Sequence, residues 1–320
     1  MKSYVVFILM LLPLLARSQA DTTQWIPPTP DHYSFIHYDE NNIMQHSRLD
    51  SVYKKLVKLH ATKKGKLNII HIGDSHLQAD GITSVVRNGF HDFFGNAGRG
   101  LVFPYQLANT NAPKDVHASS GNSWRNARVT NADPMVSVGL CGYGIECGQK
   151  NAYVRVSVRD ENSVPEYFNR MVFFLGKDKA DYLLTDSSKP DPVTFTTKQN
   201  VDTPSFVYEA DSLISGFELA KTEATGNFAF YGVSLERKDA SGVLYHTIGV
   251  NGARYDQYTN NSLFWEQLKP LRGDLFILSL GTNEAQNQGL SEQSLLAVCE
   301  AFAQRIHKIA PKAVILITTP

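Results

Sequence analysis

Two short apolar segments, each followed at once by a glycine and polar residues, most constrain what this chain can fold into. Residues 67–72 precede Gly73, and residues 275–280 precede Gly281. Short, mostly apolar runs bounded by glycine are typical of strands that are buried on both faces of a parallel sheet. Apolar residues at helical spacing follow both segments. The chain therefore predicts the strand–turn–helix units of an α/β sheet.

The middle of the chain follows a different pattern. Apolar and polar residues alternate over residues 153–158 and again over residues 231–236, and glycines and Asp/Asn/Ser clusters separate such runs. Alternation with a period of two predicts half-buried strands. We therefore expect a β-rich, sandwich-like domain over residues 105–245. It would be inserted into an α/β domain made of residues 21–104 and 246–320.

The first twenty residues have the features of a secretory signal peptide. Lys2 gives a positive start, residues 5–15 are apolar, and Ser18 and Ala20 form a small-x-small cleavage site. The apolar run is too short to span a bilayer, and an uncleaved anchor is the alternative interpretation. We expect residues 1–20 to be removed. The mature protein would then be secreted or periplasmic, without an integral membrane segment.

Charge and cysteine content exclude several classes of protein. Lys and Arg together number 31 and Asp and Glu together number 31, so no basic excess points to a nucleic-acid partner. Three cysteines are too few for a disulfide-dense scaffold, and no zinc-type spacing occurs. Cys141 and Cys147 are close enough in sequence to pair after export, and the sequence leaves that pairing open.

Three polar blocks follow predicted strands and contain candidate catalytic residues. Ser75, directly after the first strand, would present its hydroxyl near a helix start, where backbone N–H groups favour an oxyanion. Gly252 lets a backbone N–H approach a substrate closely. Asn283 offers an amide that can stabilise an oxyanion without titrating. Taken singly, each block is more typical of an ordinary turn than of a catalytic site.

Together, the blocks Gly-Asp-Ser-His, Val-Asn-Gly-Ala and Gly-Thr-Asn-Glu resemble those of the SGNH (GDSL-type) hydrolases, in the same order. No G-x-S-x-G elbow occurs, which removes the main support for an ordinary α/β-hydrolase. The run IIHIGDSHLQAD, the loop GNAGRGLVFP and the long β-rich insert narrow the resemblance to peptidoglycan O-acetylesterases. In those enzymes a carbohydrate-binding-module-like domain interrupts the hydrolase domain. The resemblance covers the layout of residues 66–320.

The resemblance implies a fold and a mechanism. The fold is a three-layer α/β/α sandwich with a parallel sheet, interrupted by the β-rich domain. Ser75 attacks the acetyl carbonyl, and the backbone N–H groups of Ser75 and Gly252 and the amide of Asn283 hold the oxyanion. An acetyl-enzyme forms and water hydrolyses it, with no metal and no cofactor. The implied substrate is an O-acetylated glycan of the cell wall.

One element of the resemblance is missing. The family takes its base histidine and orienting aspartate from a late D-x-x-H block, and none follows Asn283. His76 adjoins the serine, but neighbouring side chains usually diverge. His71 is expected to be a core histidine, and His307 lies on a predicted helix far from the strand ends. We therefore expect a truncated sequence, with the base block beyond residue 320.

Several alternatives remain open. The chain could deacetylate another polysaccharide, transfer acetyl groups with the same serine, or bind glycan without catalysis. The sequence identifies neither the glycan nor the oligomeric state. We expect the glycine-rich loop at residues 95–100 to be a substrate-side or structural loop, because it fits no phosphate-binding motif. The aromatic residues of the insert are expected to be core residues more than a sugar platform: Trp124, Phe173, Phe174, Phe228 and Phe230.

Overall fold

The computed structural model divides the chain into two compact units, residues 1–45 and 46–320. Of the first unit only residues 42–45 are described, so the predicted signal peptide lies outside the described residues. No helix in the described part of the chain is long and apolar enough to cross a membrane. The described ranges are 42–160, 162–177, 180–197, 205–222, 227–286 and 289–319.

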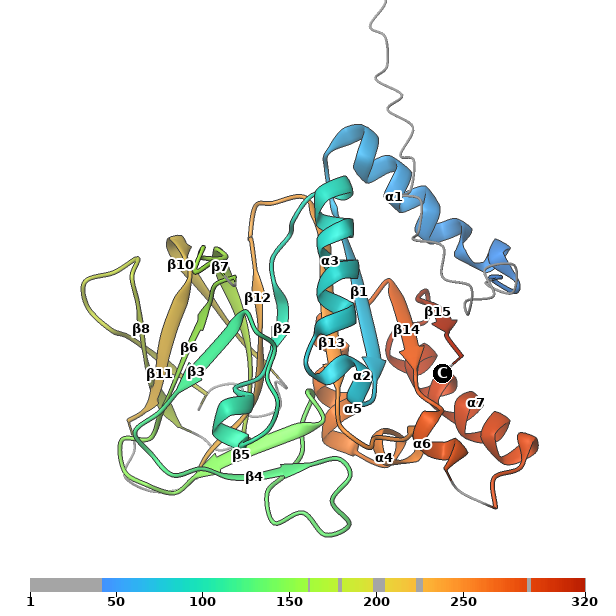
Figure 1. Ribbon diagram of the computed structural model, residues 1–320. Helices are drawn as coiled ribbons and strands as arrows, with labels where there is room; N and C mark the ends of the chain where they lie inside the picture. Colours follow the sequence, from blue (N-terminus) through green and yellow to red (C-terminus); the bar gives the residue numbers. More distant parts are fainter. Residues whose placement is uncertain are drawn as a thin grey trace, which may run out of the picture. The chain divides into compact units, whose positions relative to one another are not determined.

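A four-stranded, wholly parallel sheet forms the α/β part of the chain (Figure 1). In spatial order its strands are β13 (Gly242–Gly249), β1 (Lys66–Gly73), β14 (Leu275–Ser279) and β15 (Val314–Ile317). β1 pairs with β13 along its whole length, and Gly73 lies opposite Gly249. The carboxyl ends of these two strands therefore meet at one edge, although the strands between them in sequence belong to other sheets.

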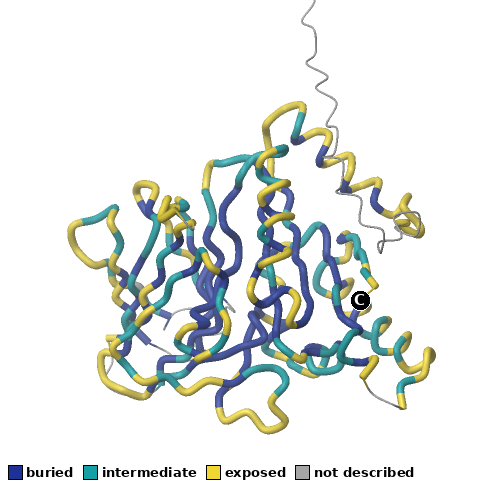
Figure 2. The backbone as a smooth tube through the Cα atoms, in the orientation of Figure 1, coloured by how far each residue is buried: buried dark blue, intermediate teal, exposed yellow. Residues whose placement is uncertain are grey.

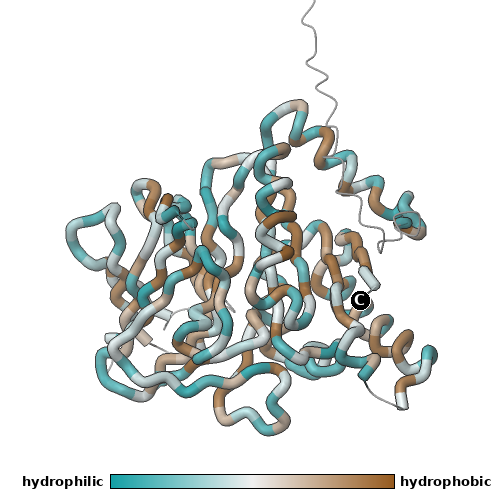
Figure 3. The backbone as a smooth tube through the Cα atoms, in the orientation of Figure 1, coloured by the Kyte–Doolittle hydropathy of each residue, from teal (hydrophilic) through white to brown (hydrophobic). Residues whose placement is uncertain are grey.

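Helices pack against both faces of this sheet. Ile69 of β1 belongs to a buried cluster with α1 (Asp50–Thr62), and Phe90 of α3 (Gly81–Phe94) packs against that cluster. The next residue, Ile70, belongs to a second cluster that contains Phe302 of α7 (Glu292–Ile309). Side chains alternate between the two faces of a strand, so each face meets different helices. β1, β13 and β14 are accordingly mostly buried in Figure 2, whereas the edge strand β15 is only partly buried. β14 and β15 are mostly hydrophobic in Figure 3.

The described residues also contain short helices. The α-helical ones are α2 (Ser75–Gln78), α4 (Tyr255–Thr259), α5 (Ser262–Leu268) and α6 (Thr282–Ala285). The 3-10 helices are η2 (His46–Leu49), η3 (Tyr105–Ala108) and η4 (Lys269–Leu271).

Two antiparallel sheets form the β-rich part. One has the order β10 (Phe206–Ile214), β7 (Phe168–Leu175), β12 (Phe228–Glu236), β5 (Tyr143–Cys147) and β4 (Arg125–Arg128), with β2 (Gly100–Val102) also paired to β12. The other has the order β3 (Val116–Ser119), β6 (Tyr153–Val158), β11 (Gly216–Lys221), β8 (Asp181–Asp186) and β9 (Val193–Thr196). Aromatic contacts such as that between Phe173 and Phe217, with ring centroids 5.2 Å apart, join the two sheets. The chain is thus mixed α/β, with one parallel sheet and a β-rich region.

The glycine-rich loop leads into β2, which pairs with β12. Its glycines allow the backbone to pass close to neighbouring segments. A Cβ at Gly98 would lie 2.5 Å from the Leu235 carbonyl oxygen, and one at Gly100 would collide with the Tyr245 carbonyl. Both glycines also have positive φ angles, of 131° and 81°. Of the two roles that the sequence left open for this loop, these contacts indicate the structural one.

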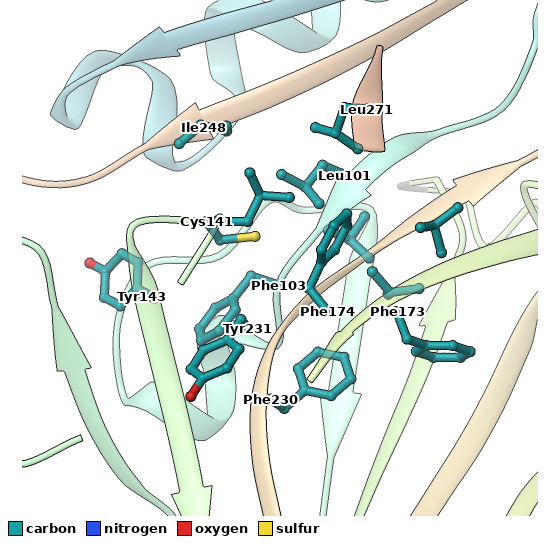
Figure 4. Close-up of a cluster of buried hydrophobic side chains, with 14 of the residues drawn as sticks. Leu101, Phe103, Cys141, Tyr143, Phe173, Phe174, Phe230, Tyr231, Ile248 and Leu271 are labelled. Carbon is teal, nitrogen blue, oxygen red and sulfur yellow. The ribbon is translucent and has the colours of Figure 1, made fainter. Parts of the chain in front are cut away.

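The buried core is continuous between the two parts (Figure 4). Ile248 of the parallel sheet belongs to the same cluster as Cys141 and Phe103 of the β-rich part. Phe173, Phe174, Phe228 and Phe230 are fully buried, and Trp124 packs against their cluster.

The cysteine pairing that the sequence left open does not occur. Cys141 and Cys147 are free thiols, and both are buried. Burial raises the pKa of Cys141, so this thiol remains protonated in a non-polar environment.

Helix α3 differs from the apolar stripe that its sequence predicts. Ile82 and Val85 are exposed, whereas Thr83 and Arg87 are buried. The cause is a buried group of charges on the inner face. Arg87 pairs with Asp80 at 2.7 Å. Periodicity shows that a helix has an apolar stripe, but it cannot reveal an ion cluster that competes for the inward face.

This cluster of charged side chains links the α/β part of the chain to the β-rich part. Asp80 also accepts a hydrogen bond from Arg99, at 2.7 Å, and Arg99 pairs in turn with Asp115. Burial opposes the ionisation of Asp80, but Arg99 and Arg87 outweigh it and hold the pKa of this carboxyl below its usual range. A buried pair of this kind is costly to break, because the remaining charge is left uncompensated.

Acid should destabilise the fold through its buried histidines. His246 is fully buried, neither ring nitrogen has a hydrogen-bond partner among the described residues, and burial lowers its pKa from 6.5 to about 3. Between these values the unfolded chain binds a proton that the folded chain does not, so stability is lost as the pH falls. At about 1.4 kcal/mol per pKa unit, this amounts to roughly 3–5 kcal/mol.

His246→Leu should therefore move the midpoint of acid unfolding to lower pH, as measured by circular dichroism. The exposed His307, changed to Gln, is the control and should leave the midpoint in place. An unchanged midpoint for His246→Leu would show that the buried imidazole does not limit acid stability.

Candidate functional site

The serine block lies where β1 ends against the rest of the sheet. A Cβ at Gly73 would lie 2.7 Å from the Ser279 carbonyl oxygen, so glycine is required for the chain to turn there. Asp74 then caps α2 by accepting a hydrogen bond from the His76 backbone N–H at 3.0 Å. Ser75 is the first residue of α2 and is exposed, while Asp74 is almost fully buried. The predicted strand–turn–helix unit presents the serine at the surface.

The glycine block follows β13, beside α2. A Cβ at Gly249 would lie 2.5 Å from the Gln78 backbone nitrogen, so glycine allows α2 to pack directly on this strand end. Gly252 has a positive φ of 81°, a conformation that favours glycine. The one neighbour that a Cβ at Gly252 would meet is Thr130 Cγ2, at 3.9 Å. The space beside Gly252 is therefore open.

The asparagine block joins the other two. Asn283 lies in α6, directly after β14, and its side-chain amide donates to the Ala253 carbonyl oxygen at 3.0 Å. The same nitrogen donates to Asp74 Oδ2 at 3.4 Å, which is long for a hydrogen bond. Asp74 precedes the serine and Ala253 follows the glycine. The structure thus brings the three predicted blocks together, after the ends of β1, β13 and β14 (Figure 1).

Two buried polar residues of the site were not predicted from the sequence. Glu284 Oε1 accepts a hydrogen bond from the Tyr255 backbone N–H at 2.7 Å, which fixes the start of α4 after the glycine block. Gln78, at the end of α2, contacts the glycine block directly, since its side chain accepts a hydrogen bond from the Asn251 backbone N–H. The position of Glu284 beside Asn283 was a usable signal, whereas nothing in the sequence pattern distinguishes Gln78.

The three histidines considered from the sequence as possible bases lie in different surroundings. His76 Nδ1 lies within hydrogen-bonding distance of Asp74 Oδ1, at 2.8 Å. Among the described residues no histidine forms a hydrogen bond with Ser75. His71 is a core residue, as expected, and burial lowers its pKa to about 4. His307 is exposed on α7.

A cavity of about 520 Å³ lies elsewhere, beside α3, and Ser75 is not among its lining residues. Charged side chains that line this cavity already have partners within the protein. Asp80 is paired with Arg87, and Asp160 accepts hydrogen bonds from two backbone N–H groups of its own loop. No cluster of His, Cys, Asp and Glu among the described residues could hold a metal ion.

No family model matches the sequence, and no curated protein matches it either. A solved structure of a peptidoglycan O-acetylesterase is similar, with a TM-score of 0.64 and 22% sequence identity over 82% of this chain and 70% of that one. The chain therefore shares the fold of that structure.

Two other solved structures are far less similar. A family two carbohydrate esterase from Cellvibrio japonicus has a TM-score of 0.23 and 8% identity, over 63% of this chain and 78% of that one. A low-affinity xylan-binding module from Roseburia intestinalis has a TM-score of 0.23 and 12% identity, over 38% of this chain and 96% of that one. At TM-scores this low, neither bears on the fold of this chain.

The contact between α2 and β13 can be tested with two glycine substitutions. Gly249→Ala should destabilise the protein by about 1–3 kcal/mol, because its methyl group would overlap the backbone of α2. Gly89→Ala is the matched control, since Gly89 lies inside α3 with open space around its Cα. This change should stabilise by about 0.5–1 kcal/mol. Equal effects of the two substitutions in urea unfolding would contradict the packing described.

Proposed function

We propose that this chain is an exported serine esterase that removes O-acetyl groups from cell-wall glycan, with peptidoglycan as its substrate. The observation that carries the proposal is the Asn283 amide, which bridges the residue before Ser75 and the residue after Gly252. A serine, a glycine N–H and an amide gathered at one sheet edge suit acyl transfer from an ester. The fold shared with a peptidoglycan O-acetylesterase supports the choice of substrate.

In the proposed reaction the Ser75 hydroxyl oxygen attacks the acetyl carbonyl carbon and gives its proton to a base. The backbone N–H groups of Ser75 and Gly252 and the Asn283 amide hold the negative oxygen of the tetrahedral intermediate. Its collapse expels the glycan oxygen, which takes the proton back from the base and leaves acetyl-Ser75. Water, deprotonated by the same base, then attacks the acetyl group, releasing acetate and the serine hydroxyl.

The hydrogen bonds of Asn283 indicate which amide hydrogen takes part. Its bond to Ala253 is short enough to hold the side chain in place, while its bond to Asp74 is long. The hydrogen directed at Asp74 makes the weaker bond and is therefore the one more readily available to an oxyanion.

The architecture that goes with this proposal is a three-layer α/β/α hydrolase domain interrupted by a β domain. The packing of α1 and α7 in different buried clusters supports the layers. The pairing of β1 with β13 supports an inserted β domain, because the strands that lie between these two in sequence belong to the antiparallel sheets. The catalytic base is proposed to come from a D-x-x-H block, as the family resemblance implies.

A non-catalytic glycan-binding protein is the second candidate. It is favoured by one observation: in the described part of the chain, no histidine is hydrogen-bonded to Ser75. An unassisted serine is a poor nucleophile, so such a protein would bind acetylated glycan and release little acetate. Acetate release by the protein made from its complete gene separates the two candidates directly.

Ser75→Ala should abolish acetate release from O-acetylated peptidoglycan and from a small acetyl ester, because the acetyl-enzyme can no longer form. The exposed Ser51 of α1, changed to Ala, is the control and should retain full activity. Acetylated xylan, assayed in parallel, tests the preference for peptidoglycan. Undiminished ester hydrolysis by folded Ser75→Ala protein would refute the serine-esterase proposal.

Asn283→Ala should lower kcat by about 10²–10³-fold, the usual effect of losing one oxyanion donor. Because Asn283 also holds Ala253, a thermal melt must show that the variant is folded at the assay temperature. Asn88→Ala, on the exposed face of α3, is the control. A kcat close to that of the unmodified protein would remove Asn283 from the oxyanion hole.

A further inference from the structure

Gln78 is a buried amide whose hydrogen-bonding capacity is fully used. It is the last residue of α2, one helical turn after Ser75, and only 2% of its surface is exposed. A glutamine side chain offers two N–H donors and two oxygen lone pairs. All four have a partner in this structure.

The oxygen of Gln78 joins the glycine block to the β-rich part. It accepts a hydrogen bond from the Asn251 backbone N–H at 2.8 Å and another from the Tyr143 hydroxyl at 3.0 Å. Asn251 directly precedes Gly252. Tyr143 begins β5, and its ring belongs to the buried cluster of Figure 4.

The nitrogen of Gln78 holds the amide in one orientation. It donates to Thr110 Oγ1 at 2.9 Å and to the Asn111 carbonyl oxygen at 3.2 Å. Both acceptors lie in the segment after η3. Because these two bonds fix which end of the amide is the nitrogen, the oxygen must face Asn251 and Tyr143.

The glycine block is therefore held on both sides of Gly252. Gln78 fixes the backbone nitrogen of the residue before it, and Asn283 fixes the carbonyl oxygen of the residue after it. Gln78 belongs to the same short helix as Ser75, so its bond to Asn251 sets the distance between that helix and the Gly252 peptide.

We propose that Gln78 is a positioning residue for the oxyanion hole, which sets the Gly252 N–H relative to Ser75 and couples this geometry to the β-rich part through Tyr143. This inference rests on the proposed esterase function. Gln78 would not contact the substrate. It would act through the backbone of the glycine block.

Gln78→Met keeps the length and volume of the side chain and removes all four hydrogen bonds. Displacing one oxyanion donor should lower kcat by about 10–100-fold, because small misplacements in a catalytic site are costly. KM should change by less than about threefold, since ground-state binding does not depend on that donor. A purely structural role would lower the melting temperature without this selective loss of kcat.

Gln267→Met is the matched control. Gln267 is a glutamine of α5 that is 1% exposed, and its oxygen accepts a hydrogen bond from the Leu140 backbone N–H at 2.9 Å. It has no part in the proposed mechanism. The control should lose thermal stability as Gln78→Met does, while its kcat at a temperature well below both melting points remains that of the unmodified protein.

Tyr143→Phe tests the coupling to the β-rich part and remains informative if Gln78→Met does not fold. Removing the hydroxyl leaves the other three bonds of Gln78, so kcat should fall by a smaller factor than in Gln78→Met. In the Gln78→Met background, Tyr143→Phe should cause no further loss, because the two residues act through one contact.

An unchanged kcat in folded Gln78→Met protein overturns the inference. If Gln78→Met does not fold, an unchanged kcat in Tyr143→Phe overturns it. It is also overturned if Gln267→Met lowers kcat to the same extent. Failure of the proposed function itself would be seen separately, as full ester hydrolysis by Ser75→Ala.

Discussion

The in-register parallel pairing of β1 with β13 is the interaction on which the rest of the structure depends. It places Gly73 opposite Gly249, so that the serine and glycine blocks leave the sheet side by side. Both strand ends are glycine for a steric reason, because a Cβ at either position would overlap the backbone or side chain of a neighbouring segment. The short helix α2 can therefore pack against the sheet edge, and Ser75 begins that helix.

Amide and carboxylate side chains then hold the segment that follows β13 in place. Asn283 and Glu284, from the third block, hold the carbonyl of Ala253 and the N–H of Tyr255. Gln78 holds the N–H of Asn251. The segment that follows β13 is thus attached at Asn251, Ala253 and Tyr255 to side chains outside itself. Such satisfied networks rigidify a site, and a rigid set of donors is what oxyanion stabilisation requires.

The sequence predicted the parts of this structure that depend on local pattern. The parallel strands at residues 67–72 and 275–280 and the β-rich middle follow from apolar periodicity and glycine placement. The inward face of α3 was not predictable, because Arg87 is buried by partners that lie elsewhere in the sequence. The role of Gln78 was hidden for the same reason, since its four partners come from three distant segments.

The central claim is that these three blocks form an acetyl-transferring serine site. Brief reaction of the protein with a small acetyl ester, acid quenching and mass analysis of its peptides test that claim most directly. The account predicts one acetyl group on the peptide that contains Ser75, and none after Ser75→Ala. Acetate release without any acetylation of Ser75 would contradict it.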